Sequence, residues 1–406
     1  MIDHIKHSAI GAACALLLTA CGGSGDTTAP LTPPVAVTPV ATKLELLSST
    51  ARAMDTVVFQ GGSAFLALAN SATEGSAVLR ATLPLTATST WRPMGLGACG
   101  MKPIGDFIMR SPKIKLVGQD VWLMQPFADT PETSDEHTTC SLSSDTVSFV
   151  PRDQDLRNCN PYFCETLSMQ DMKLAGNRLY SNAGGGNNLL TSRDGGTTWQ
   201  VIRGSKDSQI CYATKFHVIG DRVLVGGECP LDMAFVEAYR LTADGGALAG
   251  DDKLPLSVPE MENRNVQFIE SVPGTEMVFV GVEGGLLRSG DNGRSFRFVI
   301  REPLSDAKGY PYIGAFLPLK DNPGTIVVGG FDKMHGRPYL AWSDDSGYSW
   351  KDISRLVPGY DDKNDDASSL ASISSITQDP QGHIVVVANE RADGQGRLMV
   401  LTLGTN

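Results

Sequence analysis

Residues 192–199 read SRDGGTTW, and the pattern Ser-x-Asp-x-Gly-x-x-aromatic returns as SGDNGRSF at 289–296 and as SDDSGYSW at 343–350. A fourth copy, TADGGALA at 242–249, keeps the Thr, the Asp and the Gly but lacks the aromatic residue. A more degenerate copy surrounds Asp145, so the aspartates recur at intervals of roughly 50 residues. In such a segment the Asp side chain accepts backbone N–H groups and Gly permits a positive φ, which together predict a tight hairpin turn.

A second marker has the same period: a turn that contains Gly or Asn, followed by a short run rich in Val, Leu and Ile. The seven runs are expected to form strands that begin near Ser63, Asp120, Arg178, Arg222, Glu276, Thr325 and His383. Near-continuous apolar runs bounded by turn residues are typical of strands that are buried on both faces. Two independent markers with one period predict a repeat protein in which each unit is a small sheet.

The fold predicted from these repeats is all-β: a seven-bladed β-propeller of four-stranded antiparallel blades over residues 43–406. A repeat of roughly 50 residues holds four short strands and their loops. The last repeat ends without an outer strand, and KLELLSS at 43–49 precedes the first repeat without an inner partner. We expect 43–49 to close the ring as the outer strand of the seventh blade, because closure removes free sheet edges. A six-bladed ring is the alternative.

The repeated turn resembles the Asp-box, or BNR, repeat of β-propellers such as sialidases, sortilin-type receptor domains and photosystem II assembly factors. The resemblance implies that each box lies on the hairpin between the third and fourth strands, at the rim and away from the ligand face. The aspartates would then be structural, and the aromatic residue would be buried between neighbouring sheets. The residues given this structural role are Ser192, Asp194, Gly196, Trp199, Asp244, Ser289, Asp291, Gly293, Phe296, Ser343, Asp345, Gly347 and Trp350.

The N-terminal segment indicates export and lipidation. Residues 1–20 contain a long apolar run and read as a secretory signal peptide. The sequence LTAC at 18–21 resembles the lipobox of bacterial lipoproteins, which implies cleavage before Cys21 and acylation of that residue. Gly22 follows instead of an Asp, and by the same resemblance this favours the outer membrane of the cell envelope. Residues 21–42 are rich in Gly, Pro and Thr, so we expect an extended tether.

Cysteine usage agrees with an oxidising compartment. After removal of Cys14 with the signal and lipidation of Cys21, six cysteines remain: Cys99, Cys140, Cys159, Cys164, Cys211 and Cys229. An even number in such a compartment predicts disulfides, although six cysteines allow 15 pairings. Proximity in the expected ring favours Cys99–Cys140, Cys159–Cys164 and Cys211–Cys229. No second Cys or His pair has the spacing of a zinc site, so we expect no metal and no cofactor.

Charge narrows the class of partner. The chain carries a net charge of −11, and 41% of its residues are hydrophobic. An acidic globular protein is poorly suited to binding nucleic acid or acidic lipid surfaces. We therefore expect contact with the membrane through the lipid anchor alone, and a protein or glycan partner on the periplasmic or surface face of the envelope.

The topology also predicts where a ligand would bind. The loops that join second to third strands, and one blade to the next, converge on one face around the central channel. The charged and aromatic residues of these loops form the candidate ligand face: Glu132, Arg152, Tyr162, Glu228, Glu283, Asp332, His335, Arg337 and Glu390. Charged loop residues are usually only solvated, so none of them is assigned a catalytic role.

Two classes of function are consistent with this fold. Sialidases carry an Arg-Ile-Pro near the first blade, whereas this chain has only Arg-Pro at 92–93, in an expected outer strand. Another glycosidase needs two carboxylates about 5–9.5 Å apart, for which Glu228, Glu283, Asp332 and Glu390 are candidates. We predict instead a non-catalytic, lipid-anchored scaffold for binding or assembly that presents an acidic face. The alternative is a carbohydrate-active enzyme, either sialidase-like or another glycoside hydrolase or lyase.

Overall fold

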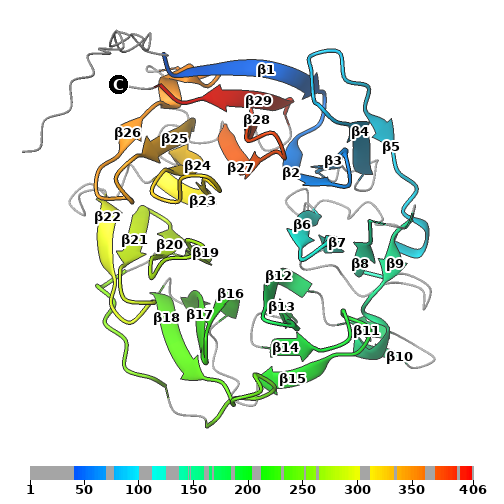
Figure 1. Ribbon diagram of the computed structural model, residues 1–406, viewed down its shortest axis with the longest axis vertical. Coiled ribbons are helices and arrows are strands. Elements are labelled where there is room, and N and C mark those ends of the chain that lie inside the picture. The colour runs from blue at the N-terminus through cyan, green and yellow to red at the C-terminus, as the bar shows by residue number, and fades with distance from the viewer. Residues whose placement is uncertain are drawn as a thin grey trace, which may run out of the picture.

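Each of the seven apolar runs forms the second strand of an antiparallel sheet in the computed structural model (Figure 1). These strands are β3 (Ser63–Leu68), β7 (Asp120–Met124), β13 (Arg178–Ala183), β17 (Arg222–Cys229), β20 (Val278–Val282), β24 (Ile326–Asp332) and β28 (Ile384–Asn389). Every side chain of β3 and β20 is buried, because neighbouring sheets pack against both faces. The strand starts expected from the sequence are therefore confirmed to within two residues.

The structure describes most of the ring and none of the N-terminal segment. The described residues are 41–69, 77–99, 112–124, 137–144, 146, 148–159, 164–166, 169–183, 188–203, 212–229, 233–250, 253–261, 265–301, 311–332, 336–361, 371–390 and 394–404. The expected signal peptide, Cys21 and Asp145 lie outside them. Within these ranges the helices are the short 3-10 turns η1 (Gly97–Cys99), η2 (Gln154–Leu156) and η4 (Ser354–Leu356). No helix in these ranges is long and apolar enough to cross a membrane.

The first strand of each sheet faces the central channel. These strands are β2 (Met54–Gln60), β6 (Lys113–Val117), β12 (Met169–Ala175), β16 (Tyr212–Ile219), β19 (Val266–Ser271), β23 (Pro311–Pro318) and β27 (Ser372–Gln378). Each begins opposite the end of its second strand, as the pairs Lys113–Met124 and Tyr212–Glu228 show. The channel therefore opens, at the end where the first strands start, among the loops that join second to third strands. We call this opening the loop mouth.

Third and fourth strands complete the blades. The third strands are β4 (Ala77–Thr82), β8 (Thr139–Leu142), β14 (Asn188–Ser192), β18 (Met233–Arg240), β21 (Gly285–Ser289), β25 (Arg337–Ser343) and β29 (Gly396–Thr402). The outer strands are β5 (Arg92–Pro93), β9 (Val150–Pro151), β15 (Gln200–Arg203), β22 (Arg297–Arg301), β26 (Lys351–Asp352) and β1 (Lys43–Thr50). The fourth blade has three strands within its described residues. A separate hairpin of β10 (Arg157–Cys159) and β11 (Cys164–Thr166) connects the second blade to the third.

Strand β1 closes the ring. It pairs antiparallel with β29 from Lys43 to Thr50, so the seventh sheet has the order β1-β29-β28-β27. The side chain of Asn389 adds a second tie between the seventh and first blades, because it bonds to both the N–H and the C=O of Met54, each at 2.8 Å. Seven blades, four-stranded sheets and closure by the N-terminal strand are thus confirmed, and the six-bladed alternative is excluded.

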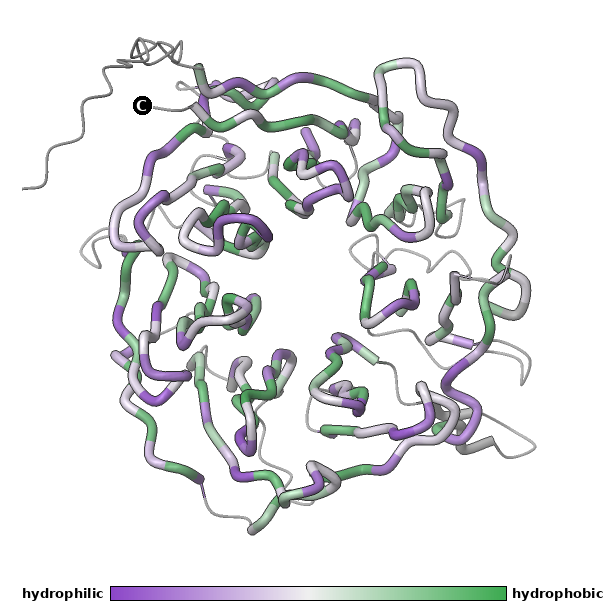
Figure 2. Tube along the Cα trace, viewed as in Figure 1, coloured by the Kyte–Doolittle hydropathy of each residue, from purple (hydrophilic) through white to green (hydrophobic). Residues whose placement is uncertain are grey.

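Hydrophobic clusters join each blade to the next. Trp122 of the second blade, for example, is 1% exposed and packs in one cluster with Met172 and Leu190 of the third blade. Burial of such a side chain contributes about 1.5–3 kcal/mol. Figure 2 shows hydrophobic and hydrophilic segments alternating along the strands of each blade, with hydrophilic residues among those nearest the centre. The packing thus leaves polar positions facing the channel.

Candidate functional site

The turn at 192–199 is held together by its own side chains. Ser192 Oγ donates to Asp194 Oδ1 at 2.8 Å and accepts the N–H of Gly196 at 2.9 Å. The same carboxylate oxygen accepts the backbone N–H groups of Thr197 at 3.0 Å and Thr198 at 2.9 Å. The Thr198 hydroxyl donates to the other oxygen at 2.6 Å. Both carboxylate oxygens of Asp194 therefore accept hydrogen bonds from the turn itself.

The turns at Asp291 and Asp345 repeat this network with bonds of 2.6–3.0 Å. All three turns connect a third strand to a fourth, namely β14 to β15, β21 to β22 and β25 to β26. Hydrogen bonds from the nearby hydroxyl and backbone N–H groups lower the pKa of Asp194, and likewise that of Asp345, to about 2. These carboxylates stay ionised and support the hairpin, so they are unsuited to proton transfer near neutral pH.

The aromatic residue of each turn packs against the preceding blade. The Trp199 and Trp122 rings meet edge to face at 6.5 Å, and Trp199 Nε1 donates to the carbonyl of Arg152 at 2.8 Å. Gly196 has a φ of +83°, and a Cβ there would lie 2.4 Å from the Trp122 ring. Glycine is needed at this position for both its conformation and its small size. The turn is therefore also an inter-blade contact.

The copy in the fourth blade uses its Asp differently. Asp244 accepts hydrogen bonds from the Thr242 hydroxyl at 2.7 Å and the Gly246 N–H at 3.1 Å. Its second oxygen forms ion pairs with Arg178, at 3.1 Å, and with Arg193, both from the third blade. These arginines link blades three and four where the sequence lacks the aromatic residue.

Two carboxylates of the expected ligand face have local partners. Glu228, at the end of β17, accepts a hydrogen bond from Asn265 Nδ2 at 2.7 Å. Glu390, directly after β28, pairs with Arg397 of β29. Both residues lie at the loop mouth, as expected, but each is bound to a side chain of its own or the adjacent blade. The described contacts do not join them into a pair of facing carboxylates.

Glu283, Asp332 and Arg337 also lie at ends of second or third strands. Glu283 occupies the turn between β20 and β21, and Asp332 lies opposite Arg337 where β24 meets β25. The Arg337 guanidinium lies 5.9 Å from the centre of the Tyr360 ring. These three residues therefore lie at the loop mouth, and their role in ligand binding stays a prediction. Glu132, Tyr162 and His335 lie outside the described residues.

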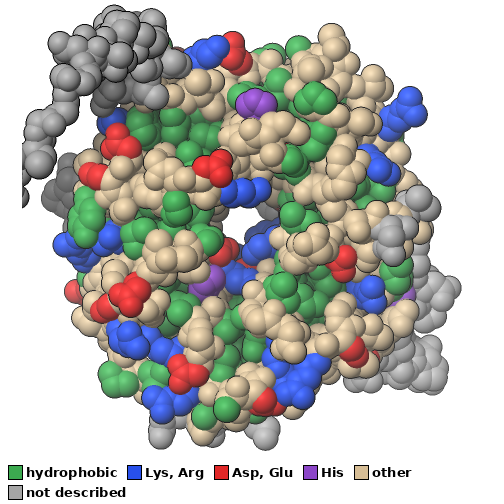
Figure 3. Space-filling view, in the orientation of Figure 1, with side chains coloured by type: hydrophobic (Ala, Val, Ile, Leu, Met, Phe, Trp, Pro, Cys, Tyr) green, Lys and Arg blue, Asp and Glu red, His purple; other side chains and the backbone are tan. Residues whose placement is uncertain are grey.

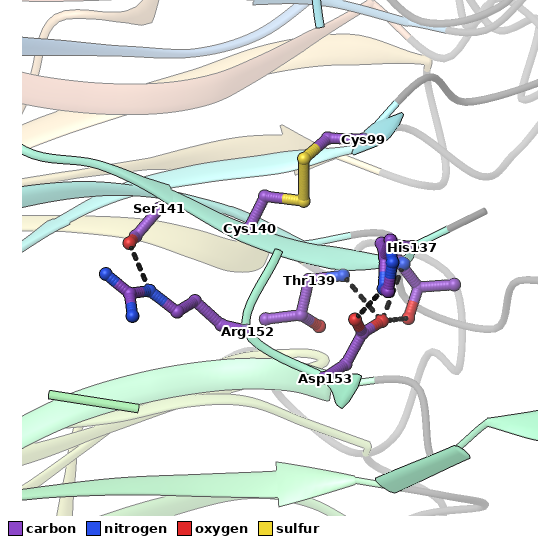
Figure 4. Close-up of a disulfide and its surroundings, with 8 residues drawn as sticks. Cys99, His137, Thr139, Cys140, Ser141, Arg152 and Asp153 are labelled. Atoms are coloured by element: carbon purple, nitrogen blue, oxygen red, sulfur yellow. Dashed lines mark hydrogen bonds and ion pairs between the residues drawn. A yellow bond between two sulfur atoms is a disulfide. The ribbon is translucent and has the colours of Figure 1, made fainter. Parts of the chain in front are cut away.

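Arg152 lies instead beside a rim turn of the third blade. Its Nε donates to Ser141 Oγ at 2.9 Å (Figure 4), and its Nη1 donates to Thr197 Oγ1 at 3.3 Å. Thr197 belongs to a turn between third and fourth strands, away from the loop mouth. The segment after the short outer strand β9 packs against the neighbouring blade. Arg152 therefore does not lie on the ligand face, where the sequence analysis had placed it.

The same close-up contains a disulfide and a buried carboxylate. Cys99 and Cys140 form a disulfide with an S–S distance of 2.10 Å, inside the cluster that joins the first two blades (Figure 4). Asp153, whose side chain is fully buried, accepts the Thr138 N–H at 2.8 Å and lies 2.6 Å from His137 Nδ1. Asp153 therefore anchors the chain that enters β8.

The other cysteine pairs remain predictions. The backbone register of β10 and β11 places Cys159 directly opposite Cys164. Cys229 ends β17, and Cys211 lies outside the described residues. Within the part of the chain that the structure describes, no group of three or more His, Cys, Asp or Glu side chains could hold a metal ion.

The channel contains a charged cluster that the sequence analysis missed. A cavity of about 520 Å³ is lined by all seven first strands. Its charged lining residues are Asp55, Lys113, Lys115, Asp171, Lys215, Glu270 and Lys320. Lysines outnumber acidic residues here, four to three, in a chain whose net charge is −11. Figure 3 shows the hollow at the centre of this face with basic side chains at its margin. The channel wall thus differs in charge from the acidic face that was expected for the surrounding loops.

Some of the charged side chains around the channel neutralise one another in ion pairs. Lys115 Nζ lies 2.7 Å from Asp171 Oδ1, and Lys173 Nζ lies 2.7 Å from Glu270 Oε1. Burial alone would raise the pKa of Asp171 and of Glu270, but the nearby ammonium groups outweigh it and hold both values below the ordinary range. Burial and the Lys173 charge lower the pKa of His217 to about 3, so its imidazole is neutral. These ion pairs connect the first strands of the second, third and fifth blades.

Lys113 and Lys215 are not neutralised in this way. Among the described residues, neither forms an ion pair with a carboxylate. Burial, together with the neighbouring Lys113 charge, lowers the pKa of Lys215 to about 7. The carboxyl groups of Asp55 and Asp171 act on Lys113 and Lys215 but form no ion pair with them. The two lysine charges repel each other, so this part of the channel attracts anions.

A sequence signal for this cluster does exist. KIKLV at 113–117 and KFHVI at 215–219 each place two basic residues two positions apart, and MKLA at 172–175 contains the single basic residue Lys173. Each segment lies directly before the turn that leads to a second strand. Alternation of this kind puts the basic residues on one face of a strand. The sequence does not show which of these strand faces lie opposite one another, because that depends on how the ring closes.

Comparison with known proteins supports the fold. No protein-family model matches this sequence, and no curated protein matches it. YCF48 from Cyanidioschyzon merolae is a similar solved structure, with 12% identity, a TM-score of 0.50, and 88% of this chain and 98% of that one covered. YCF48 bound to D1 peptide gives 13% identity and a TM-score of 0.50, with coverage of 92% and 98%.

An enzyme has a similar fold as well. The Niastella koreensis GH74 enzyme matches with 12% identity and a TM-score of 0.51 over 86% of this chain. This chain spans only 54% of the length of that enzyme. At such low identity, these likenesses concern the β-propeller fold alone.

Proposed function

We propose that this protein is a non-catalytic, lipid-anchored β-propeller that acts as a binding or assembly scaffold in the bacterial cell envelope. The observation that carries this proposal is the closed ring, whose loop mouth leads to an anion-attracting cavity of about 520 Å³. A cavity of this size lies in the range of ligand sites, about 300–1,000 Å³. A propeller of similar fold, YCF48, is described as bound to D1 peptide, which supports a protein partner for this ring too.

The hydrogen bonding of the charged groups supports binding more than catalysis. Asp194, Asp291 and Asp345 are bonded within their own turns, in the manner implied for structural Asp-boxes. At the loop mouth, Glu228 and Glu390 are each bonded to a neighbouring side chain. A glycosidase would require two carboxylates that face each other across a sugar-sized gap.

The anchoring part of the proposal concerns residues 1–42. Cleavage before Cys21, acylation of its sulfur and amine, and a Pro-rich tether would hold the ring away from the membrane surface. Mass spectrometry of the N-terminal peptide would identify acyl chains on Cys21, and replacement of Cys21 by Ser should release the protein from the membrane fraction. An unmodified Cys21 in the membrane-bound protein would contradict lipid anchoring.

The scaffold role is tested by capture from detergent-solubilised envelopes of the native host. The tagged full-length protein should retain a specific protein or glycan, and a Cys21→Ser form should retain the same one because the ring is unchanged. A ring that retains nothing, yet releases sugars from envelope glycans, would instead favour the carbohydrate-active enzyme.

A further inference from the structure

The two unneutralised lysines lie in the layer of the channel nearest the loop mouth. Lys113 is the first residue of β6, and Lys215 pairs with Gly226, two residues before Glu228 in β17. The ion-paired Lys115 and Lys173 lie further along their strands, opposite Trp122 and Tyr180. Asp171 lies at the same level as these two lysines, since each of the three is four residues before the end of its strand. A ligand that enters from the loop mouth therefore meets Lys113, Lys215 and Asp171 before it meets Lys115 and Lys173.

Repulsion between these two lysines favours the binding of an anion between them. Lys215 is partly buried, and the charge of Lys113 acts against its protonation, as does that of Lys115. Asp171 favours the protonated form, but its carboxylate already pairs with Lys115. An anion between the two ammonium groups would replace a repulsive contact by two attractive ones.

The rest of the wall is apolar and limits the kind of anion. Val58, Phe59, Phe268, Phe316 and Leu317 line the same cavity. The ring centres of Phe268 and Phe316 are 5.2 Å apart, so together they offer a continuous aromatic surface. A ligand that uses the whole site needs a charged group and an apolar body.

Two acidic neighbours argue for a single negative charge. Asp55 lines the cavity near Lys113; burial raises its pKa above the ordinary value, and when it is ionised its charge opposes a strongly negative ligand. Asp171 remains ionised and adds to this effect. A carboxylate therefore fits better than a phosphate, which carries more charge near neutral pH.

We propose that the channel binds an organic carboxylate, with its anionic group between Lys113 and Lys215 and its apolar part against Phe268 and Phe316. This inference rests on the proposed function, since it gives the binding ring a ligand chemistry. A free organic acid and the C-terminal carboxylate of a protein chain share that chemistry. The site is distinct from the residues of the expected ligand face and from the rim turns.

The test uses isothermal titration calorimetry on the full-length protein in detergent near pH 6. The probes are benzoate, its neutral analogue benzamide, phenyl phosphate, and a heptapeptide that ends in Phe with either a free carboxylate or an amide. The variants are Lys113→Met and Lys215→Met, which keep the side-chain length but remove the charge. Lys253→Met is the matched control, because Lys253 lies on the surface, where it pairs with Glu237.

We expect benzoate to bind wild type and Lys253→Met equally, and to bind Lys113→Met and Lys215→Met about tenfold or more weakly. Benzamide and the amidated peptide should bind poorly, and phenyl phosphate should bind less well than benzoate. A free-carboxylate peptide that binds more tightly than benzoate identifies a chain terminus as the source, and the opposite order identifies a small acid. Equal binding of benzoate and benzamide, equal binding by both channel variants and wild type, or no binding of any probe overturns the inference.

Capture from envelopes separates this inference from the proposed function. If wild type retains a partner while no carboxylate binds the channel, the scaffold role stands and the channel site fails. If benzoate binds as expected but no partner is retained, the site stands and the scaffold role fails.

Discussion

The rim turns and the channel wall use charged side chains in opposite ways. At the rim, Asp345 accepts two backbone N–H groups and two hydroxyl hydrogens, all from its own turn. In the channel, Lys113 and Lys215 come from separate blades, their charges act on each other, and neither forms an ion pair with a carboxylate among the described residues. A charged side chain that recurs in several repeats and has partners within its own turn, such as Asp345, stabilises the fold. A charged side chain that is not part of this repeat and has no ion-pair partner in the described part of the chain, such as Lys113, is available for a ligand.

The largest effect is expected from the rim glycine at the inter-blade contact. Gly196→Ala should destabilise the ring by about 3 kcal/mol or more, because the new Cβ meets the Trp122 ring and the residue has a left-handed φ. Gly195→Ala is the matched control, since Gly195 also has a positive φ but no atom within 4 Å of a Cβ. That control should lose only about 1–2 kcal/mol. Chemical denaturation measures both, and equal losses would show that the turn does not pack between blades as described.

A smaller loss is expected from the rim carboxylate itself. Asp345→Ala should cost about 1–2 kcal/mol, because two backbone N–H groups lose their acceptor in a solvent-accessible turn. The neighbouring Asp344→Ala removes only a surface ion pair with Lys351 and should cost less than about 1 kcal/mol.

The stability difference between wild type and Asp345→Ala should depend on pH. The folded-state pKa of Asp345 is about 2, below its ordinary value of 3.8, so its stabilising effect is complete above 3.8 and is lost as the pH falls towards 2. The stability gap between wild type and Asp345→Ala should therefore narrow over this window. A gap that stays constant would mean that ionised Asp345 does not hold the turn.

The effect expected in the channel is on binding. Lys215 has a pKa of about 7, so its side chain is mostly charged below that pH and mostly neutral above it. Benzoate affinity should therefore fall as the pH rises through 7, by up to about tenfold at one pH unit above. Lys215→Met should bind weakly with a flat profile over the same range. A wild-type profile that is also flat would show that Lys215 does not contact the anion.

The fold could be predicted from the sequence because its determinants are local and repeated. The aspartates at 194, 291 and 345 mark equivalent hairpins, and the apolar second strands mark the interior of each blade. Closure by Lys43–Thr50 followed from counting strands, since the last repeat lacked one. Such features depend on a few adjacent residues and on the period, both of which are visible in a single chain.

The channel site could not be predicted in the same way. Lys113 and Lys215 are about a hundred residues apart, and each belongs to a strand that alternates polar and apolar residues in an ordinary manner. Their proximity depends on how strongly the ring curves and on which first-strand faces turn inward. The sequence analysis favoured loop residues because binding residues often lie on loops. Two of these residues, Glu228 and Glu390, are instead bonded to the neighbouring side chains of Asn265 and Arg397.

Arg152 shows a second limit of reading loops from sequence. The segment after Pro151 looks like a free link between blades, yet its guanidinium reaches Ser141 and Thr197 at the rim. The outer strand before it is only two residues long, so the chain stays packed against the next blade.

The separation of architecture from binding is tested most directly by one paired measurement: thermal melting and benzoate titration of Asp345→Ala and Lys215→Met beside wild type. We predict that Asp345→Ala melts at a lower temperature but, while folded, binds benzoate as wild type does. Lys215→Met should melt no lower than wild type, because a repulsive charge has been removed, and should lose benzoate binding. The reverse pattern, with binding lost in Asp345→Ala and kept in Lys215→Met, would contradict the account.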